Sequence, residues 1–185
     1  KFPFIKKRKF YLFLGRFHEK KGCEIIIKSI KKLGKKINTP ILLAGPFRNN
    51  NYEKKLINLV KKHNLQKKIF FSDALYRDLK WGAIYSSKAM LLASHGENFG
   101  ISLAESLSMG RPVLTTNKVN IHKIISKYNA GLISSNTVNS FSNQLYNFEN
   151  LKNKKLMAMS VNAEKCFDIN FNLSLNDKSL IKLII

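Results

Sequence analysis

Acidic residues are scarce in this sequence of 185 residues, and long hydrophobic runs are missing. Only 11 aspartates and glutamates stand against 33 lysines and arginines, which gives a formal net charge of +22. No stretch approaches the roughly 18 apolar residues of a membrane-spanning helix, and no secretory signal is visible at the start. A hydrophobic content of 44% excludes a disordered chain and is typical of one globular domain.

The cysteines and histidines are few and form no site motif. Cys23 and Cys166 are far apart in the chain, which predicts reduced thiols in a cytoplasmic protein. The 4 histidines lack the spacing of metal ligands, so no metal site is expected. Neither GxGxxG nor GxxxxGK[ST] occurs, so the fingerprints of dinucleotide-binding and P-loop proteins do not apply.

The excess of positive charge predicts attraction to polyanions, namely nucleic acid, anionic lipid headgroups and phosphorylated small molecules. Much of the lysine lies in helix-like runs such as KSIKKLGKK and YEKKLINLVKKHN, where it forms a solvated face. Heavy use of Lys, Asn and Ile throughout favours a compositional bias over a dedicated nucleic-acid surface. Residues 1–9 are typical of a basic linker, and the missing initial Met indicates a fragment of a longer protein.

Short apolar segments alternate with helix-like segments along the chain. The expected strands are 10–15, 40–45, 67–71, 89–93, 111–116 and 130–134, and the expected helices between them are 23–33, 52–64, 78–87, 100–110 and 121–128. Such alternation implies crossover connections and a parallel sheet that is buried on both faces. We therefore predict an α/β domain with a Rossmann-like, doubly wound parallel sheet over residues 10–170. A C-terminal helix is expected over 171–185, after a break near 168–177.

In a doubly wound sheet, ligands bind beyond the carboxyl ends of the strands, so the residues after each strand carry the information. The first expected strand is followed by GRFHEKKG, in which Gly15 permits a tight turn. Arg16 and Lys21 flank the start of the next helix and, with the helix amides, would form an anion site. Solvated surface charges explain the same two residues equally well.

The fourth expected strand is followed by SHGENFGISLAE. Gly100 lets the backbone approach a ligand, and the amides of Phe99, Gly100 and Ile101 favour a phosphate at the helix start. Glu97 beside such a phosphate would face hydroxyl groups, or it is an ordinary helix N-cap. Glu105 lies in a largely apolar helix and contacts ligand hydroxyls or is a surface charge. Cations for phosphate and acids for hydroxyls together point to a sugar nucleotide.

The segments LGRFHEKKG, LLAGP and ASHGENFGISLAESLSMGRPVLTT together resemble the C-terminal domain of retaining family-4 glycosyltransferases of the GT-B fold. The resemblance covers about residues 10–135 and depends most on two glutamates with seven residues between them. It implies transfer of a sugar from UDP-sugar or GDP-sugar, with retention and without a metal. It also implies an N-terminal domain, absent from this chain, that binds a glycan or lipid-linked acceptor. We therefore expect the chain alone to bind donor and to transfer little or nothing.

The resemblance also implies roles for individual residues. Arg16 and Lys21 correspond to the pair that binds the donor diphosphate, and Glu97 to the acid that contacts the hydroxyls of the transferred sugar. These three are expected to be catalytic. Glu105 corresponds to the acid that holds the ribose hydroxyls. The other expected donor-binding residues form the turn after the first strand or a loop whose backbone faces the sugar and diphosphate: Gly15, Asn98, Phe99, Gly100 and Ile101.

Two loops depart from the pattern of the family. Ser72 and Asp73 stand where many relatives have a glycine, within the segment 72–75 that is expected to meet the base. After the fifth strand many relatives have a Gly-Gly and a later Glu, whereas NKVNIHK gives Val119, Asn120 and Lys123 here. That difference affects the local loop shape and the acceptor contacts, but not the donor motif.

Three functions are compatible with these features. The leading hypothesis is the donor half of a glycosyltransferase that makes a surface polysaccharide or lipid-linked glycan at the cytoplasmic face of a membrane, where its positive charge meets anionic headgroups. A basic nucleic-acid-binding module is the first alternative, although no specific nucleic acid is expected, and its binding would collapse between low and moderate salt. A sugar-nucleotide epimerase or phosphorylase of similar fold is the second.

Overall fold

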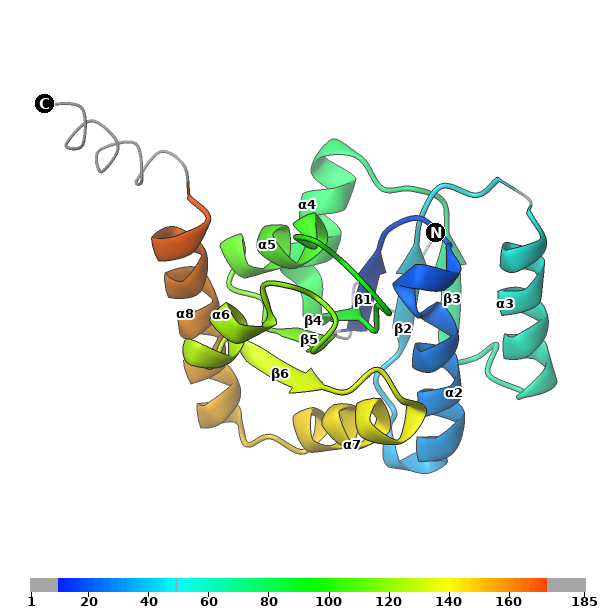
Figure 1. The fold of residues 1–185 in the computed structure, drawn as a ribbon. Helices are drawn as coiled ribbons and strands as arrows, with labels where there is room; N and C mark the ends of the chain where they lie inside the picture. The colour runs from blue at the N-terminus through cyan, green and yellow to red at the C-terminus, as the bar shows by residue number, and fades with distance from the viewer. Residues whose placement is uncertain (1–9, 49, 173–185) are drawn as a thin grey trace, which may run out of the picture.

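The core of the chain is one sheet of six parallel strands in the order β3-β2-β1-β4-β5-β6. The computed structural model in Figure 1 describes residues 10–48 and 50–172. The strands are β1 (Phe10–Leu14), β2 (Ile41–Ala44), β3 (Ile69–Ser72), β4 (Ser87–Leu92), β5 (Val113–Thr116) and β6 (Gly131–Ser134). The predicted Rossmann-like, doubly wound α/β fold is confirmed. Its winding reverses between β1 and β4, which pair at the centre of the sheet.

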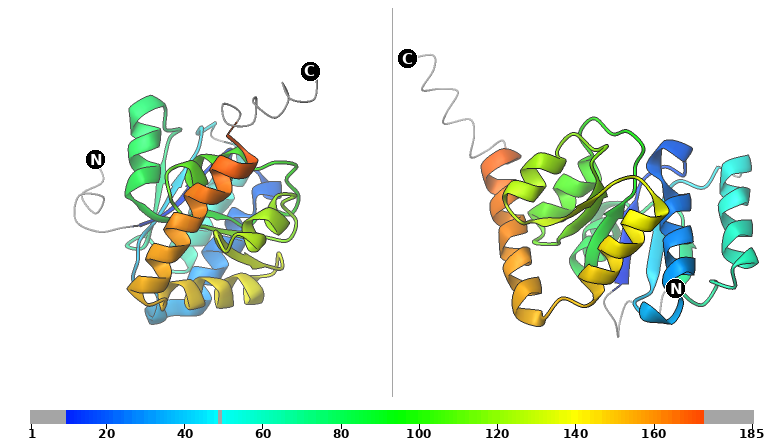
Figure 2. Two further views of the ribbon diagram at one scale, coloured as in Figure 1. Left: turned by 90° about the vertical axis from the view of Figure 1, so that its left-hand side faces the viewer. Right: turned by 60° about the horizontal axis from the view of Figure 1, so that its bottom comes forward.

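The helices form two groups because right-handed crossovers that run in opposite directions from the centre place them on opposite faces of the sheet. Their bounds are α2 (Cys23–Leu33), α3 (Asn51–Lys62), α4 (Arg77–Ser86), α5 (Ile101–Ser108), α6 (His122–Lys127), α7 (Val138–Glu149) and α8 (Asn153–Asn170), with short 3₁₀ turns η1 (Glu19–Lys21) and η2 (Gly34–Lys36). Helix α2 contacts α3 and α7, whereas α5 contacts α4 and α8. Helices α3 and α8 lie at opposite ends of the sheet (Figures 1 and 2).

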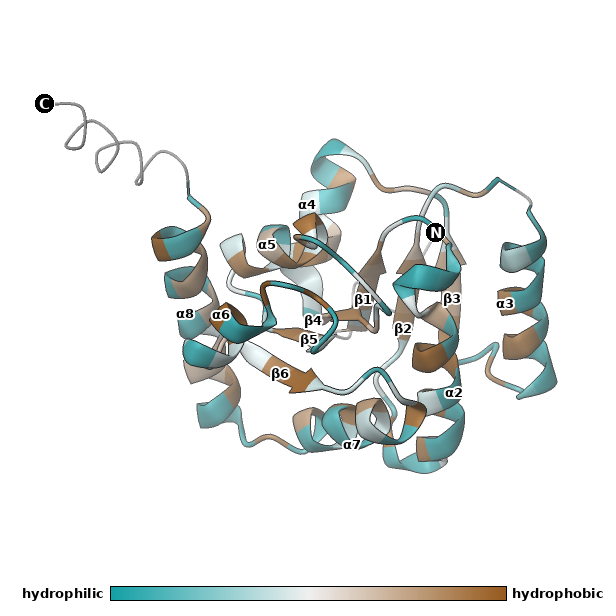
Figure 3. Cartoon of the chain, viewed as in Figure 1, coloured by the Kyte–Doolittle hydropathy of each residue, from teal (hydrophilic) through white to brown (hydrophobic). Residues whose placement is uncertain are grey.

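The strands form because their apolar side chains are covered on both faces. Leu12 of β1 pairs with Leu42 and Met90 of its neighbours, and all three are fully buried. Helix α2 is apolar on one side only: it buries Ile26 and Ile30 while its lysines stay exposed. Figure 3 shows this as brown strands and helices of mixed colour. A sheet covered in this way positions the loops at its carboxyl edge rigidly.

Several boundaries differ from the prediction by a few residues. Strand β4 begins at Ser87 rather than at residue 89, because Ser87 pairs with Phe10 at the start of β1. The break expected near 168–177 is present, since α8 ends at Asn170. The predicted final helix, 171–185, does not begin at Phe171, which caps α8. The rest of that helix and the predicted linker 1–9 lie outside the described residues.

Both cysteines are free, as predicted, and the structure shows that both are buried. Burial raises the pKa of the Cys166 thiol to about 11 and also raises the pKa of Cys23. The cysteines therefore contribute packing to the core rather than reactive thiolates.

Within the described part of the chain, no helix has the length and apolar character that crossing a bilayer requires.

A partly buried carboxylate joins the end of α7 to the start of the sheet. Glu149 accepts hydrogen bonds from the Tyr11 hydroxyl at 2.6 Å, the Thr39 hydroxyl at 2.7 Å and the Lys88 ammonium at 2.7 Å. Burial by itself would raise the pKa of Glu149, but these three donors and the charge of Lys88 outweigh it and lower the pKa. Burial and the neighbouring carboxylate raise the pKa of Tyr11 in turn.

Replacing Glu149 with glutamine is expected to lower the free energy of unfolding by about 1–3 kcal/mol at neutral pH. Because the folded-state pKa of Glu149 lies below its ordinary value of 4.5, this stability is present above that pH and is lost as the pH falls through the lower folded value. Urea unfolding of both proteins should therefore show a difference at pH 7 that shrinks under acid conditions. A difference that stays constant down to pH 3 would contradict this assignment.

Candidate functional site

A cavity of about 380 Å³ lies at the carboxyl end of the sheet. Its walls come from the ends of β1 and β2, the loop before α4, the loop after β4 and the first turns of α5. The cavity lies beyond the carboxyl ends of β1 and β4, the two strands between which the winding reverses. Ligands of doubly wound sheets bind at this position. The residues that line it are Leu14, Gly15, Arg16, Lys21, Ala44, Gly45, Pro46, Ala74, Leu75, Tyr76, Lys80, Glu97, Gly100, Ile101, Ser102 and Glu105.

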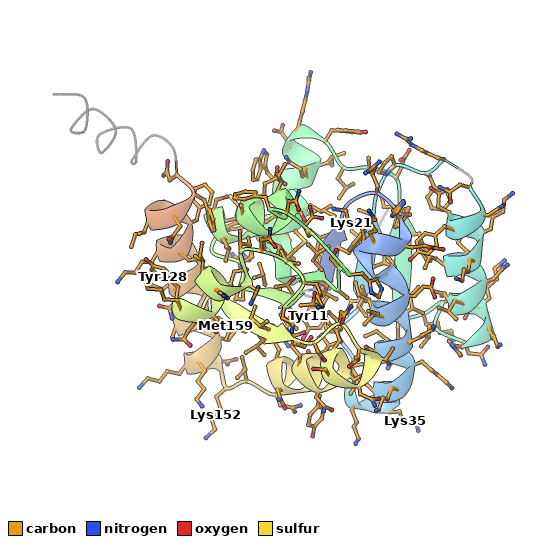
Figure 4. All side chains as sticks on the ribbon, in the orientation of Figure 1. Tyr11, Lys21, Lys35, Tyr128, Lys152 and Met159 are labelled. Carbon is orange, nitrogen blue, oxygen red and sulfur yellow. The ribbon has the colours of Figure 1, made fainter. Side chains whose placement is uncertain are left out.

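The loop after β1 brings two cations to this cavity. Arg16 is exposed and forms no ion pair with any acid of the described residues, so its guanidinium is available to a ligand. Lys21 ends the turn η1, and Figure 4 shows it at the cavity end of the sheet, with Lys35 and Lys152 at the opposite end. The turn is fixed from the loop after β4, because the Ser94 hydroxyl donates to the Lys20 carbonyl at 2.6 Å.

The backbone of Glu97 is held by the loop that follows β5. The Glu97 amide donates to the carbonyl of Lys118, and the Asn120 amide donates to the carbonyl of Glu97, each at 3.0 Å. These bonds form an isolated bridge with Val119. The segment NKVNIHK, which departs from the family pattern in sequence, therefore supports the acid at the cavity rather than leaving its position open.

The side chain of Glu97 forms an ion pair with Lys21. The two side chains are 19% and 26% exposed, so the pair lies at the wall of the cavity and only partly in solvent. Glu97 is not the N-cap of α5, because Gly100 occupies that position. The structure thus excludes the reading of Glu97 as an ordinary capping residue.

The N-terminus of α5 is open towards the cavity. Gly100 has a φ of 76°, in the left-handed region that favours glycine, and it makes no side-chain capping bond. The first turn of α5 contains no acidic residue. Its free amides and the positive end of the helix dipole therefore meet the cavity without a competing carboxylate of the same turn.

Glu105 is the second acid of the cavity and lies one turn further along α5. Its carboxylate accepts a hydrogen bond from the Lys80 ammonium of α4 at 2.6 Å. The Glu105 side chain is 23% exposed and the Lys80 side chain 27% exposed. Glu105 therefore faces the cavity wall, not the open surface, which excludes the reading of it as a solvated helix charge.

The structure gathers most of the predicted site residues and leaves two aside. Asn98 and Phe99 do not line the cavity; the Phe99 ring packs edge-on against Phe171 at the end of α8, with 5.4 Å between ring centroids. Sequence reasoning missed Lys80 and Tyr76 because α4 shows no motif. Its position after β3, at a strand end, was the available signal. Within the described residues no three His, Cys, Asp or Glu side chains gather as a metal site.

The fold is the C-terminal half of the GT-B glycosyltransferase architecture, a Rossmann-like sheet followed by C-terminal helices. The sequence matches the family of glycosyl transferases group 1 over residues 1–166, and the chain belongs to that family.

Three relatives illustrate the similarity. The O-antigen biosynthesis glycosyltransferase WclY of Escherichia coli is 33% identical over 100 residues, which are 54% of this chain and 26% of that protein. The solved C-terminal domain of the group 1 glycosyl transferase LpcC from Francisella tularensis shares 20% identity and a TM-score of 0.76, over 88% of this chain and 86% of that one. Anabaena HepE, solved with UDP-glucose, shares 17% identity and a TM-score of 0.81, over 97% and 49%.

This chain thus spans about a quarter of the length of the curated relative WclY. It spans about half of the HepE chain, which is built on the same fold. The two solved structures are too distant in sequence to show more than the fold.

Proposed function

We propose that this chain is the donor-binding half of a retaining, metal-independent glycosyltransferase that builds a surface polysaccharide or a lipid-linked glycan. One observation carries the proposal. A single cavity gathers the cations Arg16 and Lys21, the open N-terminus of α5 and the acids Glu97 and Glu105. Fixed positive groups suit a diphosphate, and carboxylates that only accept hydrogen bonds suit the hydroxyls of ribose and sugar.

The chemistry of the proposed reaction follows from these charges. Negative charge develops on the diphosphate as its bond to the sugar breaks. Arg16, Lys21 and the α5 amides are already in place at that end of the cavity, so they stabilise this charge without reorganising. This is the role that a metal ion would otherwise have. Glu97, paired with Lys21, would accept hydrogen bonds from the hydroxyls of the transferred sugar.

A second domain that faces the cavity would bind the glycan or lipid-linked acceptor. The proposal places the protein in the cytoplasm at the inner face of a membrane, where its net charge of +22 favours anionic headgroups. The relationship to WclY, whose name assigns it to O-antigen biosynthesis, supports a surface polysaccharide as product. The isolated chain should then bind donor but transfer little, and robust transfer by it to a sugar acceptor would contradict this division of labour.

Calorimetric titration with UDP, GDP and ADP tests the donor site directly. We expect the chain to bind one of these diphosphates more tightly than the others, and the affinity to fall less than tenfold between about 50 and 200 mM salt. UDP is the first to test, because the similar HepE was solved with it. The affinity for a nucleic acid whose phosphates contact several lysines and arginines would instead fall by about 10³-fold or more over that range.

Glu105→Ala tests the proposed ribose contact in the same titration. It should weaken binding of the preferred nucleotide, since a hydroxyl–carboxylate bond contributes about 1.5–3 kcal/mol. Binding could instead be weak, equal for the three bases, abolished by salt and unchanged in Glu105→Ala. Such a result would mean that only the overall positive charge attracts the nucleotide. The basic nucleic-acid-binding module would then become the better reading.

A further inference from the structure

Lys80 is a third cation at the cavity of the proposed donor site, beside Arg16 and Lys21. It lies in the first turn of α4, where its amide donates to the Tyr76 carbonyl at 3.3 Å. Its ammonium is held twice: 2.6 Å from a Glu105 carboxylate oxygen and 4.5 Å from the centre of the Trp81 ring. A lysine fixed by an anion and an aromatic face loses the freedom of an ordinary surface lysine.

The backbone before Lys80 is also unusual. Arg77 begins α4 with a φ of 46°, in the left-handed region that non-glycine residues seldom adopt. The first turn of α4 takes its direction from this residue and carries Lys80 to the cavity wall. Strained residues of this kind cluster at functional sites, where the surrounding structure holds them.

The hydrogen bonds of Glu105 leave room for a ligand. Lys80 occupies one carboxylate oxygen, Oε1, and the described residues place no hydrogen-bond donor on the other, Oε2. An ionised carboxylate has about four acceptor positions, so it can hold Lys80 and vicinal hydroxyls at once. A carboxylate already fixed by one lysine needs no reordering when these hydroxyls arrive.

We infer that Lys80 is a positioning residue for the donor nucleotide: it fixes the Glu105 carboxylate so that this acid recognises the ribose hydroxyls. The inference rests on the proposed function, because it requires a nucleoside diphosphate in the cavity. Lys80 acts through Glu105 and not on the phosphates, which meet Arg16, Lys21 and the α5 amides. Removal of Lys80 should therefore reduce recognition of the ribose and leave recognition of the diphosphate intact.

The test compares the preferred nucleoside diphosphate with its 2′-deoxy and 3′-deoxy forms by calorimetry. Wild type should bind the ribonucleotide about tenfold or more tightly than at least one deoxy form. In Lys80→Met and in Glu105→Ala this ratio should fall to about twofold or less. The double variant should lose no more than Glu105→Ala alone, since one residue acts through the other. Lys80→Arg, which keeps a cation beside Glu105, should recover most of the ratio.

Two further measurements separate the possible outcomes. Inorganic pyrophosphate should bind Lys80→Met and wild type equally; equal weakening of pyrophosphate and of every nucleotide would show that Lys80 contacts phosphate and would overturn the inference. Lys55→Met removes the same charge from an exposed pair with Glu24, away from the donor cavity, and should leave the ratio unchanged. If the ratio of ribonucleotide to deoxynucleotide affinity is unchanged in Lys80→Met, the ion pair between Lys80 and Glu105 is only structural and the inference is overturned. If wild type binds none of the diphosphates, the proposed function fails first.

Discussion

Replacing Gly22 with alanine is expected to lower the free energy of unfolding by about 3–5 kcal/mol, a large share of the total for a domain of this size. Gly22 links the turn η1 to α2 and has a φ of 71°, where a side chain costs about 1–2 kcal/mol. A Cβ atom there would also lie 1.9 Å from the carbonyl oxygen of Ala93, which is backbone. Helix α2 or the end of β4 must therefore move.

Two other glycines separate the causes in the same urea titration. Gly34 has a φ of 54° but open space around it, so Gly34→Ala should show the conformational cost alone. Gly82 lies within α4 in open space and its φ is not positive, so Gly82→Ala should be neutral or stabilising by up to about 1 kcal/mol. A Gly22 variant no less stable than the Gly34 variant would show that α2 and β4 tolerate the displacement.

Replacing Lys21 with alanine is expected to raise the Kd of the preferred nucleoside diphosphate by roughly 10- to 100-fold, which corresponds to about 1.5–3 kcal/mol. Two effects act in the same direction. The diphosphate loses a charge-assisted hydrogen bond. Glu97 loses its partner and remains as an unneutralised carboxylate at the wall of the same cavity, where it repels the ligand. Calorimetry at moderate salt measures the change.

Lys20→Ala is the control for Lys21→Ala, because it removes the same charge from the adjacent residue. The Lys20 side chain is exposed and lines a different cavity, with Glu19, Glu24 and His95. Its structural contribution to the site is a backbone carbonyl, which alanine retains. We expect a change in Kd of less than about twofold. Equal losses in the two variants would mean that the overall positive field, and not a built site, attracts the nucleotide.

The alternation of apolar and amphipathic segments was sufficient to predict the fold class, because a parallel sheet covered on both faces needs uninterrupted apolar strands. It also predicted where the cavity lies, since residues that follow the strand ends at Leu14 and Leu92 line it. The spacing between Glu97 and Glu105 and the pair Arg16 and Lys21 identified the family. The apolar alternation and the motif spacings are local features of the sequence, so they can be recognised without knowing how distant segments pack.

The tertiary structure alone decided which groups face one another. Lys80 and Glu105 are brought together from different helices, and the Glu97 backbone is held by the loop at Val119. Neither contact leaves a local pattern, because each depends on how separate crossovers pack against the sheet. The same holds for the ring of Phe99, which packs against Phe171 at the end of α8. The sequence by itself determined the fold and the chemical character of the site; packing between distant segments decided how its charges are paired.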